Sequence, residues 1–439
     1  MNTATTAREP LPRGFWVIWT TVAIDLIGFG IVLPILPQYA ERFGAGAAVI
    51  GLLSATFSLA QLVFAPVWGK LSDRIGRKPI IILSLCGTAV GSLVTGFAGA
   101  LWILFLGRII DGISGASVSV AQAAVADISP ARQRARYMGL IGAAFGVGFV
   151  AGPIIGSLAA LVDPKAPFFV AAAIAATNAL IALKRLPETT HGVAGHPLAR
   201  PDVVAAREAE AAAADADAEN IAAAPALDGP GIVEPAHGVF HHAHADHTSP
   251  ARRAEIIRLI VIAFVGIVAF SGFEATFSLL ASNRYGLGLS GTAAVFAGIG
   301  VVLVGVQGGL VGPVTRRLGE TRTLRFGLIS NCFGLFVLAF DLGWAGLVVA
   351  LLLLTVGQGL LTPTLSSAVA GRAGRDTGVW LGWQQSAGGA GRVVGPLAAG
   401  ALFQWAGMGW PYAVGAALAA FALTLVPGRP KSASAVTAG

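Results

Sequence analysis

The chain has 439 residues, of which 55% are hydrophobic and only 12% are charged, with a mean hydropathy of +0.76. Soluble domains carry about 25% charged residues, so this composition excludes an ordinary soluble protein and places most of the chain in lipid. The net charge of +7 indicates base-rich loops on one side of a membrane rather than a nucleic-acid partner.

Twelve apolar segments of roughly membrane-spanning length follow one another along the chain. The first six occupy residues 15–37, 48–68, 79–99, 101–122, 138–160 and 166–184. The other six occupy residues 257–281, 291–311, 323–341, 343–368, 377–403 and 410–427. We therefore expect an all-α membrane protein with twelve transmembrane helices.

The first segment contains an acid, Asp25, followed by Gly28, Gly30, Pro34 and Pro37. An acid at this depth costs about 2.5–3.5 kcal/mol on insertion scales, so its side chain is expected to face a cavity or a partner. The acid and the prolines suit a retained spanning helix better than a cleaved signal peptide.

Five charges lie in the short loop after the second segment, Gly69-Lys70-Leu-Ser-Asp73-Arg74-Ile-Gly76-Arg77-Lys78. The pattern Gly-x-Leu-x-Asp-Arg-x-Gly-Arg-Lys closely resembles the loop signature of the major facilitator superfamily of secondary transporters. That resemblance implies two six-helix bundles, which rock around a substrate site at the middle of the membrane.

The same resemblance implies a charge relay of Asp73, Arg77 and Asp127 near the cytoplasmic end of the eleventh helix. Such a relay, with Gly69, Arg74 and Gly76 shaping the loop, would lock the two bundles together in the outward-facing state. The alternative is that these charges only fix the orientation of the loop in the membrane.

The first segment, with its pattern Asp-x-x-Gly-x-Gly-x-x-x-Pro-x-x-Pro, resembles the first helix of drug:proton antiporters in this superfamily. In the fourth segment, Arg108 and Asp111 are three residues apart and so share a helix face, where they are expected to pair. The resemblance places an arginine here beside the proton pathway, with Gln more usual at the Asp111 position. Asp111 is therefore a second titrating site or, as we favour, a fixed counter-ion for Arg108.

The fifth segment carries Gly148, Gly152, Pro153 and Gly156. Small residues at this spacing form a smooth groove for another helix. The pattern Gly-x-x-x-Gly-Pro-x-x-Gly also resembles the antiporter motif of exporters. Generic helix packing remains the alternative, since Gly395-Pro396 recurs in the second half.

Residues 187–254 between the halves have no apolar periodicity and contain all seven histidines. Such a composition cannot bury enough surface to order itself, so a disordered cytoplasmic linker is expected. The run from His241 to His247 could bind a divalent metal, but a solvated linker is the simpler reading, and we expect no metal site and no cofactor.

The two halves are repeats at a constant spacing of 243 residues, which relates Gly69 to Gly312 and Gly152-Pro153 to Gly395-Pro396. This spacing predicts an N-terminal bundle over 14–186 and a C-terminal bundle over 255–427. Short tails, 1–13 and 428–439, complete the chain. The second loop differs from the first because Asp73 corresponds to Arg316.

Polar groups at membrane depth in both bundles suit a roomy, mostly apolar substrate cavity. Its candidate residues are Gln61, Gln307, Gln358, Trp383, Gln384 and Arg392. Glu274 in the seventh segment is a further candidate for proton coupling, with a role as a gate as the alternative. Neither Glu274 nor Arg392 has a partner nearby in sequence.

Lys and Arg are distributed very unevenly over the predicted loops. The N-terminus, alternate loops and C-terminus hold 24 of them, and the opposite side holds only Arg42, Lys165 and Arg284. Basic loops stay in the cytoplasm, so both termini are predicted to be cytoplasmic in a multi-pass protein of the cell membrane.

We interpret the chain as a proton-coupled antiporter that exports amphipathic organic molecules, and not as an enzyme. Its expected partners are a small-molecule substrate, protons and the bilayer, and a monomer is expected. Tetracycline exporters carry extra acids in helices 3 and 9 and a histidine in helix 8. Residues 79–99 and 291–311, the third and eighth segments, have no such residue, and the only acid near the ninth segment is Asp341 at its outer edge, which argues against tetracycline. The alternatives are a facilitator or symporter of a small metabolite or sugar and, from another class, a membrane sensor or lipid-modifying enzyme.

Overall fold

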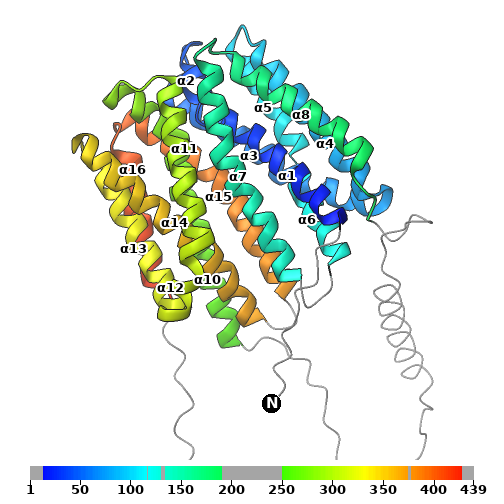
Figure 1. Cartoon of the computed structure of the whole chain (residues 1–439). Helices are drawn as coiled ribbons and strands as arrows, with labels where there is room; N and C mark the ends of the chain where they lie inside the picture. The colour runs from blue at the N-terminus through cyan, green and yellow to red at the C-terminus, as the bar shows by residue number, and fades with distance from the viewer. Residues whose placement is uncertain (1–12, 116, 130–133, 190–249, 374–376, 428–439) are drawn as a thin grey trace, which may run out of the picture.

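The computed structural model describes residues 13–115, 117–129, 134–189, 250–373 and 377–427, and every element in these ranges is a helix (Figure 1). The first bundle consists of α1 (Arg13–Val32), α2 (Leu36–Glu41), α3 (Ala47–Ile75), α4 (Arg77–Gly96), α5 (Leu101–Ser114), α6 (Ser117–Ile128), α7 (Arg134–Ala160) and α8 (Ala166–Arg185). The second consists of α10 (Pro250–Tyr285), α11 (Leu289–Gly305), the π-helix η1 (Val306–Leu310), α12 (Val311–Leu318), α13 (Glu320–Ala339), α14 (Gly343–Ala373), α15 (Thr377–Trp405) and α16 (Trp410–Leu425).

Ten of the described helical segments are long and apolar enough to cross a membrane. One of them combines α5 with α6, and another combines α11, η1 and α12. The 29-residue α15 is not among the ten, and α16 is apolar but only 16 residues long. The prediction of an all-helical membrane protein is therefore confirmed, whereas the count of twelve spans is supported only approximately.

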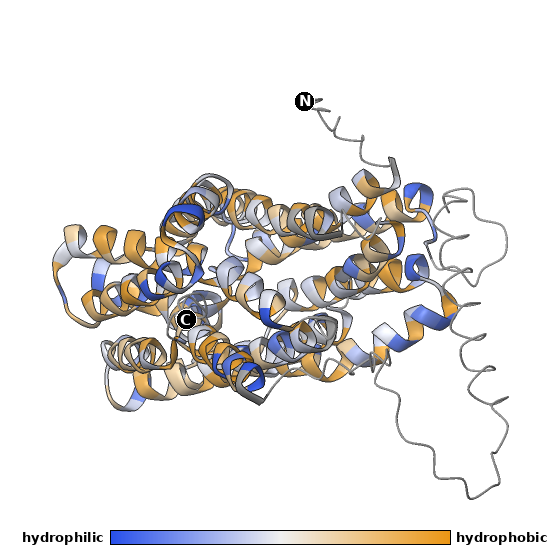
Figure 2. Ribbon diagram, turned by 90° about the horizontal axis from the view of Figure 1, so that it is seen from below, coloured by the Kyte–Doolittle hydropathy of each residue, from blue (hydrophilic) through white to orange (hydrophobic). Residues whose placement is uncertain are grey.

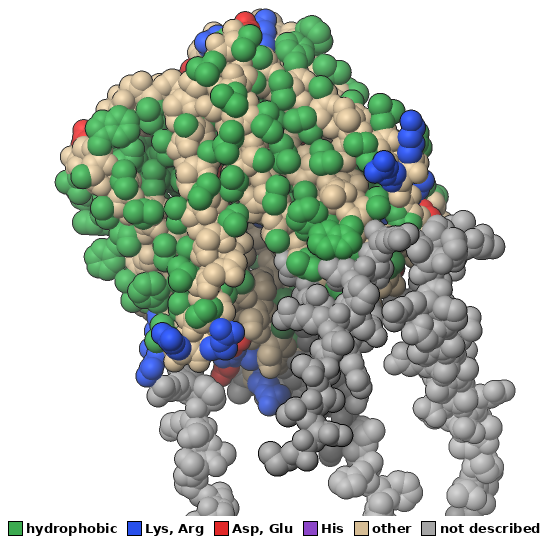
Figure 3. Space-filling view, viewed as in Figure 1, with side chains coloured by type: hydrophobic (Ala, Val, Ile, Leu, Met, Phe, Trp, Pro, Cys, Tyr) green, Lys and Arg blue, Asp and Glu red, His purple; other side chains and the backbone are tan. Residues whose placement is uncertain are grey.

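Large hydrophobic side chains cover the outside of the molecule. Trp405 is 76% exposed and Phe97 is 73% exposed, values that suit contact with lipid rather than with water. Hydrophobic colours dominate the helices in Figure 2, and Figure 3 shows Lys and Arg gathered toward the edges of the visible face. The exposed Trp102, Trp344 and Trp410 resemble the aromatic belts at membrane surfaces.

Apolar cores hold each bundle together, and one of them continues across both bundles, because Leu279 and Ala293 join the buried residues around Phe168. In the first bundle, α1 packs against α7 and α8, and α4 packs against α5 and α8. The second bundle repeats the arrangement, with α10 against α15 and α16, and α13 against α14 and α16. Phe15, Phe168 and Phe277 are fully buried in these cores.

Two helix pairs form most of the contact between the bundles, namely α3 with α15 and α7 with α11. Glycine permits the close approach. A Cβ atom at Gly51 would lie 2.2 Å from the carbonyl oxygen of Pro396, and one at Gly300 would lie 2.3 Å from that of Phe149. The bundles therefore meet backbone to backbone, as expected where lipid supplies no hydrophobic force between helices.

Hydrogen bonds between the bundles gather at one end of the molecule, which we call the Gln38 end. The Gln38 side-chain amide is buried and lies 2.8 Å from Thr292 Oγ1 and 3.2 Å from the carbonyl oxygens of Ser278 and Leu287. The Ser278 hydroxyl donates to the Pro34 carbonyl at 2.9 Å. All hydrogen bonds recorded between the bundles for described residues are at this end, which is therefore closed.

The opposite end, which we call the basic end, carries the two loops related by the repeat. Gly76 separates α3 from α4 with φ +105°, and Gly319 separates α12 from α13 with φ +77°. Positive φ is readily adopted only by glycine, so the two glycines that are 243 residues apart make equivalent turns.

The predicted linker over 187–254 lies almost entirely outside the described residues, as do both predicted tails. On either side of it, α8 ends at Arg185 and α10 begins at Pro250. Deleting residues 196–245 is therefore expected to leave membrane insertion and transport unchanged within about twofold, because a segment of this composition contributes no packed core. Transport assays in membrane vesicles check this. Loss of activity in a variant with all seven histidines replaced by Ala, together with metal-dependent activity of the unmodified chain, would contradict it.

Candidate functional site

The centre of the basic end is Arg77 in the first turn of α4. Its guanidinium contacts Asp73 Oδ1 at 2.6 Å and Asp127 Oδ2 at 3.1 Å, and donates to the Ser72 hydroxyl at 2.6 Å. The structure thus brings together the three charges that the resemblance placed in one relay. The Asp73 side chain is 62% exposed, whereas that of Asp127 is 21% exposed. Asp127 is therefore the firmer partner, because exposed ion pairs contribute little.

Glu188 holds this loop in place, although the sequence analysis did not single it out. Its carboxylate accepts the backbone N–H groups of Arg77 at 2.7 Å and Lys78 at 3.1 Å, and so caps the first turn of α4. A carboxylate at this position also interacts favourably with the helix dipole. A Cβ at Gly76 would lie 2.3 Å from Glu188 Oε2, so this position requires glycine for lack of space as well as for its φ angle. Gly69 accepts the Ser72 hydroxyl, and Arg74 is exposed.

The second bundle has a related cluster with opposite signs. Glu320 stands 243 residues after Arg77, at the start of α13, and lies 3.6 Å from Arg372 near the end of α14. Arg372 also contacts Glu255 of α10 at 2.9 Å. An acid thus replaces Arg77 in the repeat, and its base, Arg372, stands two residues after the position equivalent to Asp127. The sequence shows that Arg316 replaces Asp73 in the second loop, which predicted that this loop lacks the acid. It did not predict the cluster of Glu255, Glu320 and Arg372.

Three charges lie away from the ends of the spanning segments of the first bundle. Arg108 Nη1 contacts Asp111 Oδ2 at 2.8 Å, and its guanidinium lies 4.2 Å from the ring centre of Phe57. The predicted pairing at spacing three is therefore present, and both side chains are largely buried. Asp25 on α1 instead accepts a hydrogen bond from the Ser117 hydroxyl at the start of α6. No ion pair joins Asp25 to a cation of the described residues.

Glu274 and Arg392 form the corresponding charged region of the second bundle. Glu274 on α10 is half-buried, and Arg392 on the adjacent α15 is exposed and acts on it electrostatically. Neither residue has a charged partner nearby in the sequence. The packing of α10 against α15 brings the two into the same region.

The glycines of the proposed antiporter motif lie in the contact between α7 and α1. A Cβ at Gly148 would lie 2.6 Å from the Leu26 side chain, and one at Gly152 would lie 2.6 Å from the backbone of Gly30. Gly156 faces Ile31 and Ile35 in the same way. Pro153 lies inside α7. The motif thus permits the backbones of two helices to touch beside the Asp25 region.

Replacing Gly30 by Ala is expected to destabilise the first bundle by about 1–3 kcal/mol, the usual range for overpacking. Its Cβ would lie 2.5 Å from the Gly148 carbonyl oxygen, which belongs to the backbone and cannot rotate away. Thermal unfolding of the detergent-solubilised protein measures the effect. Gly28→Ala is the matched control on the same helix, because its Cβ would have its nearest neighbour at 4.0 Å. Equal losses in both variants would contradict this account of the contact.

The polar residues predicted to line the cavity occupy different environments. Gln307 in η1, Trp383 and Arg392 are exposed. Gln358 is buried and accepts a hydrogen bond from Asn331 at 3.4 Å, and Gln384 donates to Ser366 at 3.1 Å. Gln61 donates to the Gly115 carbonyl at 2.8 Å.

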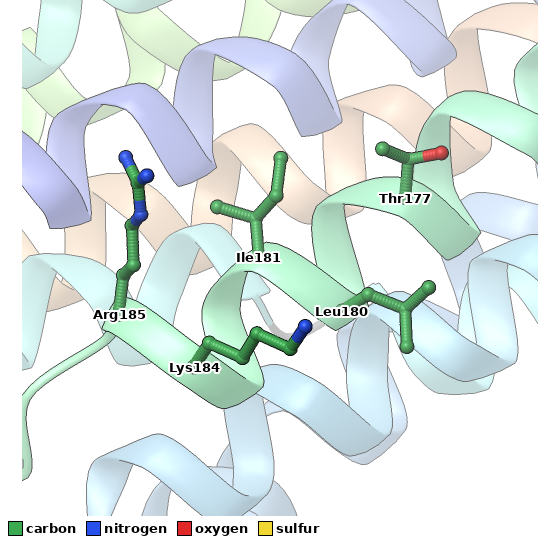
Figure 4. A pocket seen from close by; sticks show the side chains of 5 residues that line it. All are labelled: Thr177, Leu180, Ile181, Lys184 and Arg185. Carbon is green, nitrogen blue, oxygen red and sulfur yellow. The ribbon is translucent and has the colours of Figure 1, made fainter.

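Two surface hollows lie away from these residues. One of about 500 Å³ is at the Gln38 end and is lined by residues of both bundles, including Glu41, Arg42 and Ser290. Burial there raises the pKa of the Glu41 carboxyl above its usual value. The other, of about 300 Å³, lies along α8 between Thr177 and Arg185 (Figure 4). None of the predicted site residues lines either hollow.

Comparison with known proteins agrees with this architecture. The family model described as Major Facilitator Superfamily matches residues 18–340 and 308–438. The chain is 30% identical over 379 residues to the class B tetracycline resistance protein of Escherichia coli, covering 85% of this chain and 84% of that protein. It is 26% identical over 394 residues to multidrug resistance protein 2 of Bacillus subtilis (strain 168), covering 89% and 88% of the two chains.

A solved structure supports the fold. The crystal structure of a human organic anion transporter superposes with a TM-score of 0.65 at 24% identity, covering 95% of this chain and all of that one. Together with the loop around Arg77 and the paired bundles, these matches show that the chain is a multi-pass membrane transporter rather than an enzyme, and that it belongs to the major facilitator superfamily.

Proposed function

We propose that the chain is a proton-coupled antiporter that exports amphipathic organic molecules. The observation that carries this proposal is the environment of Asp25. Its carboxylate lies within a spanning helix, yet its hydrogen-bond partner is the neutral Ser117 hydroxyl, while Asp111 takes the charge of Arg108. Asp25 can therefore gain or lose a proton without breaking an ion pair, which suits a proton carrier. Glu274, near but not bonded to Arg392, is the second candidate carrier.

The closed Gln38 end supports alternating access. Basic loops stay in the cytoplasm, so the basic end is placed there, together with both termini, in the cell membrane. With the Gln38 end closed, substrate enters from the cytoplasm in the present arrangement. A proton arriving from outside neutralises the acid and weakens the hold on substrate, and the bundles rock around a site between them. The bundles over 14–186 and 255–427 move as units of one monomer.

The relatives bear on the substrate class. They are named for resistance to tetracycline and to multiple drugs, which are amphipathic organic molecules. The missing acid in α4 and the missing histidine in α11 argue for a multidrug range rather than tetracycline. Exposed Gln307, Trp383 and Arg392 offer few polar anchors to such substrates, which suits a broad pocket. The relay at the basic end and the α1–α7 contact serve the rocking motion.

Expression in a pump-deficient bacterial host tests the proposal. Cells are challenged with a panel of toxic amphipathic compounds that includes tetracycline, with and without a proton uncoupler. We expect reduced susceptibility to several compounds, reversed by the uncoupler and absent in cells expressing Asp25→Asn. Transport that persists with the uncoupler would favour a facilitator and overturn the proposal.

A further inference from the structure

The fourth spanning segment is interrupted in the middle of the first bundle. α5 ends at Ser114, and Gly115 has φ −71° and ψ +35°, outside the helical region, before α6 begins at Ser117. The Gly115 N–H bonds to the carbonyl of Gly112, three residues back. The repeat-related helix α14 runs unbroken through Gln358, the position 243 residues after Gly115. The break therefore belongs to the first bundle alone.

Side chains of neighbouring helices bind the carbonyl groups around this break. On α3, Gln61 donates to the Gly115 carbonyl at 2.8 Å and Trp68 donates to the Ile113 carbonyl at 2.6 Å. On α4, Ser84 donates to the Ser114 carbonyl. Lipid offers no water to such groups, so a break in a spanning helix persists only where protein groups satisfy it. Three separate side chains do so here, which makes the interruption a built feature.

Ser84 also fixes the far side of the break. Its hydroxyl oxygen accepts the Ser117 N–H at 2.9 Å, so a single side chain connects the end of α5 to the start of α6. Both serines are buried. A Cβ at Gly87 would overlap the Ser114 side chain, with 1.8 Å to its Oγ, so α4 lies directly against this end of α5. The position of Ser117 is thereby set by α4.

Ser117 in turn donates its hydroxyl to Asp25 Oδ2. Among the charges of neighbouring elements, Asp111 of α5 acts on Asp25, and Asp111 is itself paired with Arg108. The other helices that pack against α1 carry their charged residues near their ends, Arg134 and Arg136 in α7 and Lys184 and Arg185 in α8. Asp127 likewise stands at the end of α6. The hydroxyl is therefore the direct polar contact of the carboxylate.

We infer that Ser117 is a positioning residue for the proton carrier, held in place by Ser84 across the interrupted helix. It fixes the orientation of the Asp25 carboxylate and, by donating to the anion, favours release of the proton. This inference rests on the proposed role of Asp25 in proton coupling. No feature of the sequence motifs around Asp25 or Arg108 assigns a role to either serine.

The pH profile of transport tests the inference in proteoliposomes that contain the full chain and a substrate found in the susceptibility panel. A hydrogen bond from a hydroxyl stabilises an anion, so Ser117→Ala is expected to shift the pH of half-maximal antiport upward by about one unit. Ser117→Cys keeps the volume with a poor donor and is expected to shift the profile similarly. Ser117→Thr restores the hydroxyl and should restore the profile. Substrate exchange down its gradient, without net proton movement, should stay within about twofold in all three.

Ser84→Ala is expected to shift the profile in the same direction as Ser117→Ala, because Ser117 loses its anchor. The matched control is Ser92→Ala, a buried serine two turns further along α4, which should keep the original profile. An unshifted profile in both Ser117→Ala and Ser117→Cys, with Asp25→Asn inactive in antiport, would overturn this inference alone. Full pH-dependent antiport in Asp25→Asn would instead overturn the proposed role of Asp25 as the proton carrier, on which this inference rests.

Discussion

Replacing Asp25 with Asn is expected to abolish proton-driven export while substrate exchange down its gradient continues. The amide matches the shape of a permanently protonated carboxyl, and it can still contact Ser117, so helix packing is preserved. Without a group that loses its proton, the reorientation of the empty carrier cannot be coupled to proton flow. Uphill transport driven by an imposed pH gradient should fall at least 100-fold, and counterflow of labelled substrate should stay within about threefold.

Glu274→Gln is the matched control for Asp25→Asn, because it removes the other candidate acid from the second bundle. If Asp25 carries the proton, the Glu274 variant keeps a pH-dependent uphill component. The opposite outcome, full uphill transport in Asp25→Asn with an unchanged pH profile, would make Asp25 structural and Glu274 the carrier. Counterflow in both variants separates a coupling defect from a folding defect.

Asp73→Asn is expected to slow transport by about tenfold while leaving the amount of protein in the membrane unchanged. The side chain is 62% exposed at the basic end, so its loss removes no buried packing. Its effect is expected in the opposite conformation, in which the basic end closes and this carboxylate meets the second bundle. Hydrogen bonds to charged groups contribute roughly 1.5–3 kcal/mol, enough for a tenfold change in the equilibrium between two conformations.

Arg316→Ala is the matched control, because Arg316 occupies the repeat-related position and is exposed in the second bundle. It should change the transport rate by less than twofold, since the cluster of the second bundle is built on Arg372 instead. Transport rates normalised to membrane protein, measured in vesicles, compare the two. Equal damage from both substitutions would mean that these charges act only on topology, and the relay would be abandoned.

The features that the sequence predicted depend on local pattern. Apolar runs of membrane-spanning length predicted the helical membrane fold, since few other structures tolerate them. The spacing of three predicted the Arg108–Asp111 pair, because both lie on one helix face. The loop pattern predicted that Arg77 would join Asp73 and Asp127. The count of twelve spans was less secure, because α16 has only 16 residues.

What the sequence missed depends on partners far apart in the chain. Glu188 caps α4 from 111 residues away, and Gln38 reaches Thr292 over a separation of 254 residues. The break at Gly115 is equally non-local, because Gln61, Trp68 and Ser84 all donate to it from other helices. A glycine in an apolar run gives no sign of such a break, whereas an acid directly after the last apolar segment of a bundle could have indicated Glu188.

Proton movement coupled to substrate tests the central proposal most directly. Purified protein is reconstituted in vesicles that contain a pH-sensitive dye, and a transported compound is added with no initial pH gradient. Antiport predicts that substrate flux in one direction drives protons in the other, with a dye signal that is lost in Asp25→Asn and retained in Arg316→Ala. Substrate flux of normal rate with no change in internal pH, and with no response to an imposed pH gradient, would contradict proton-coupled export.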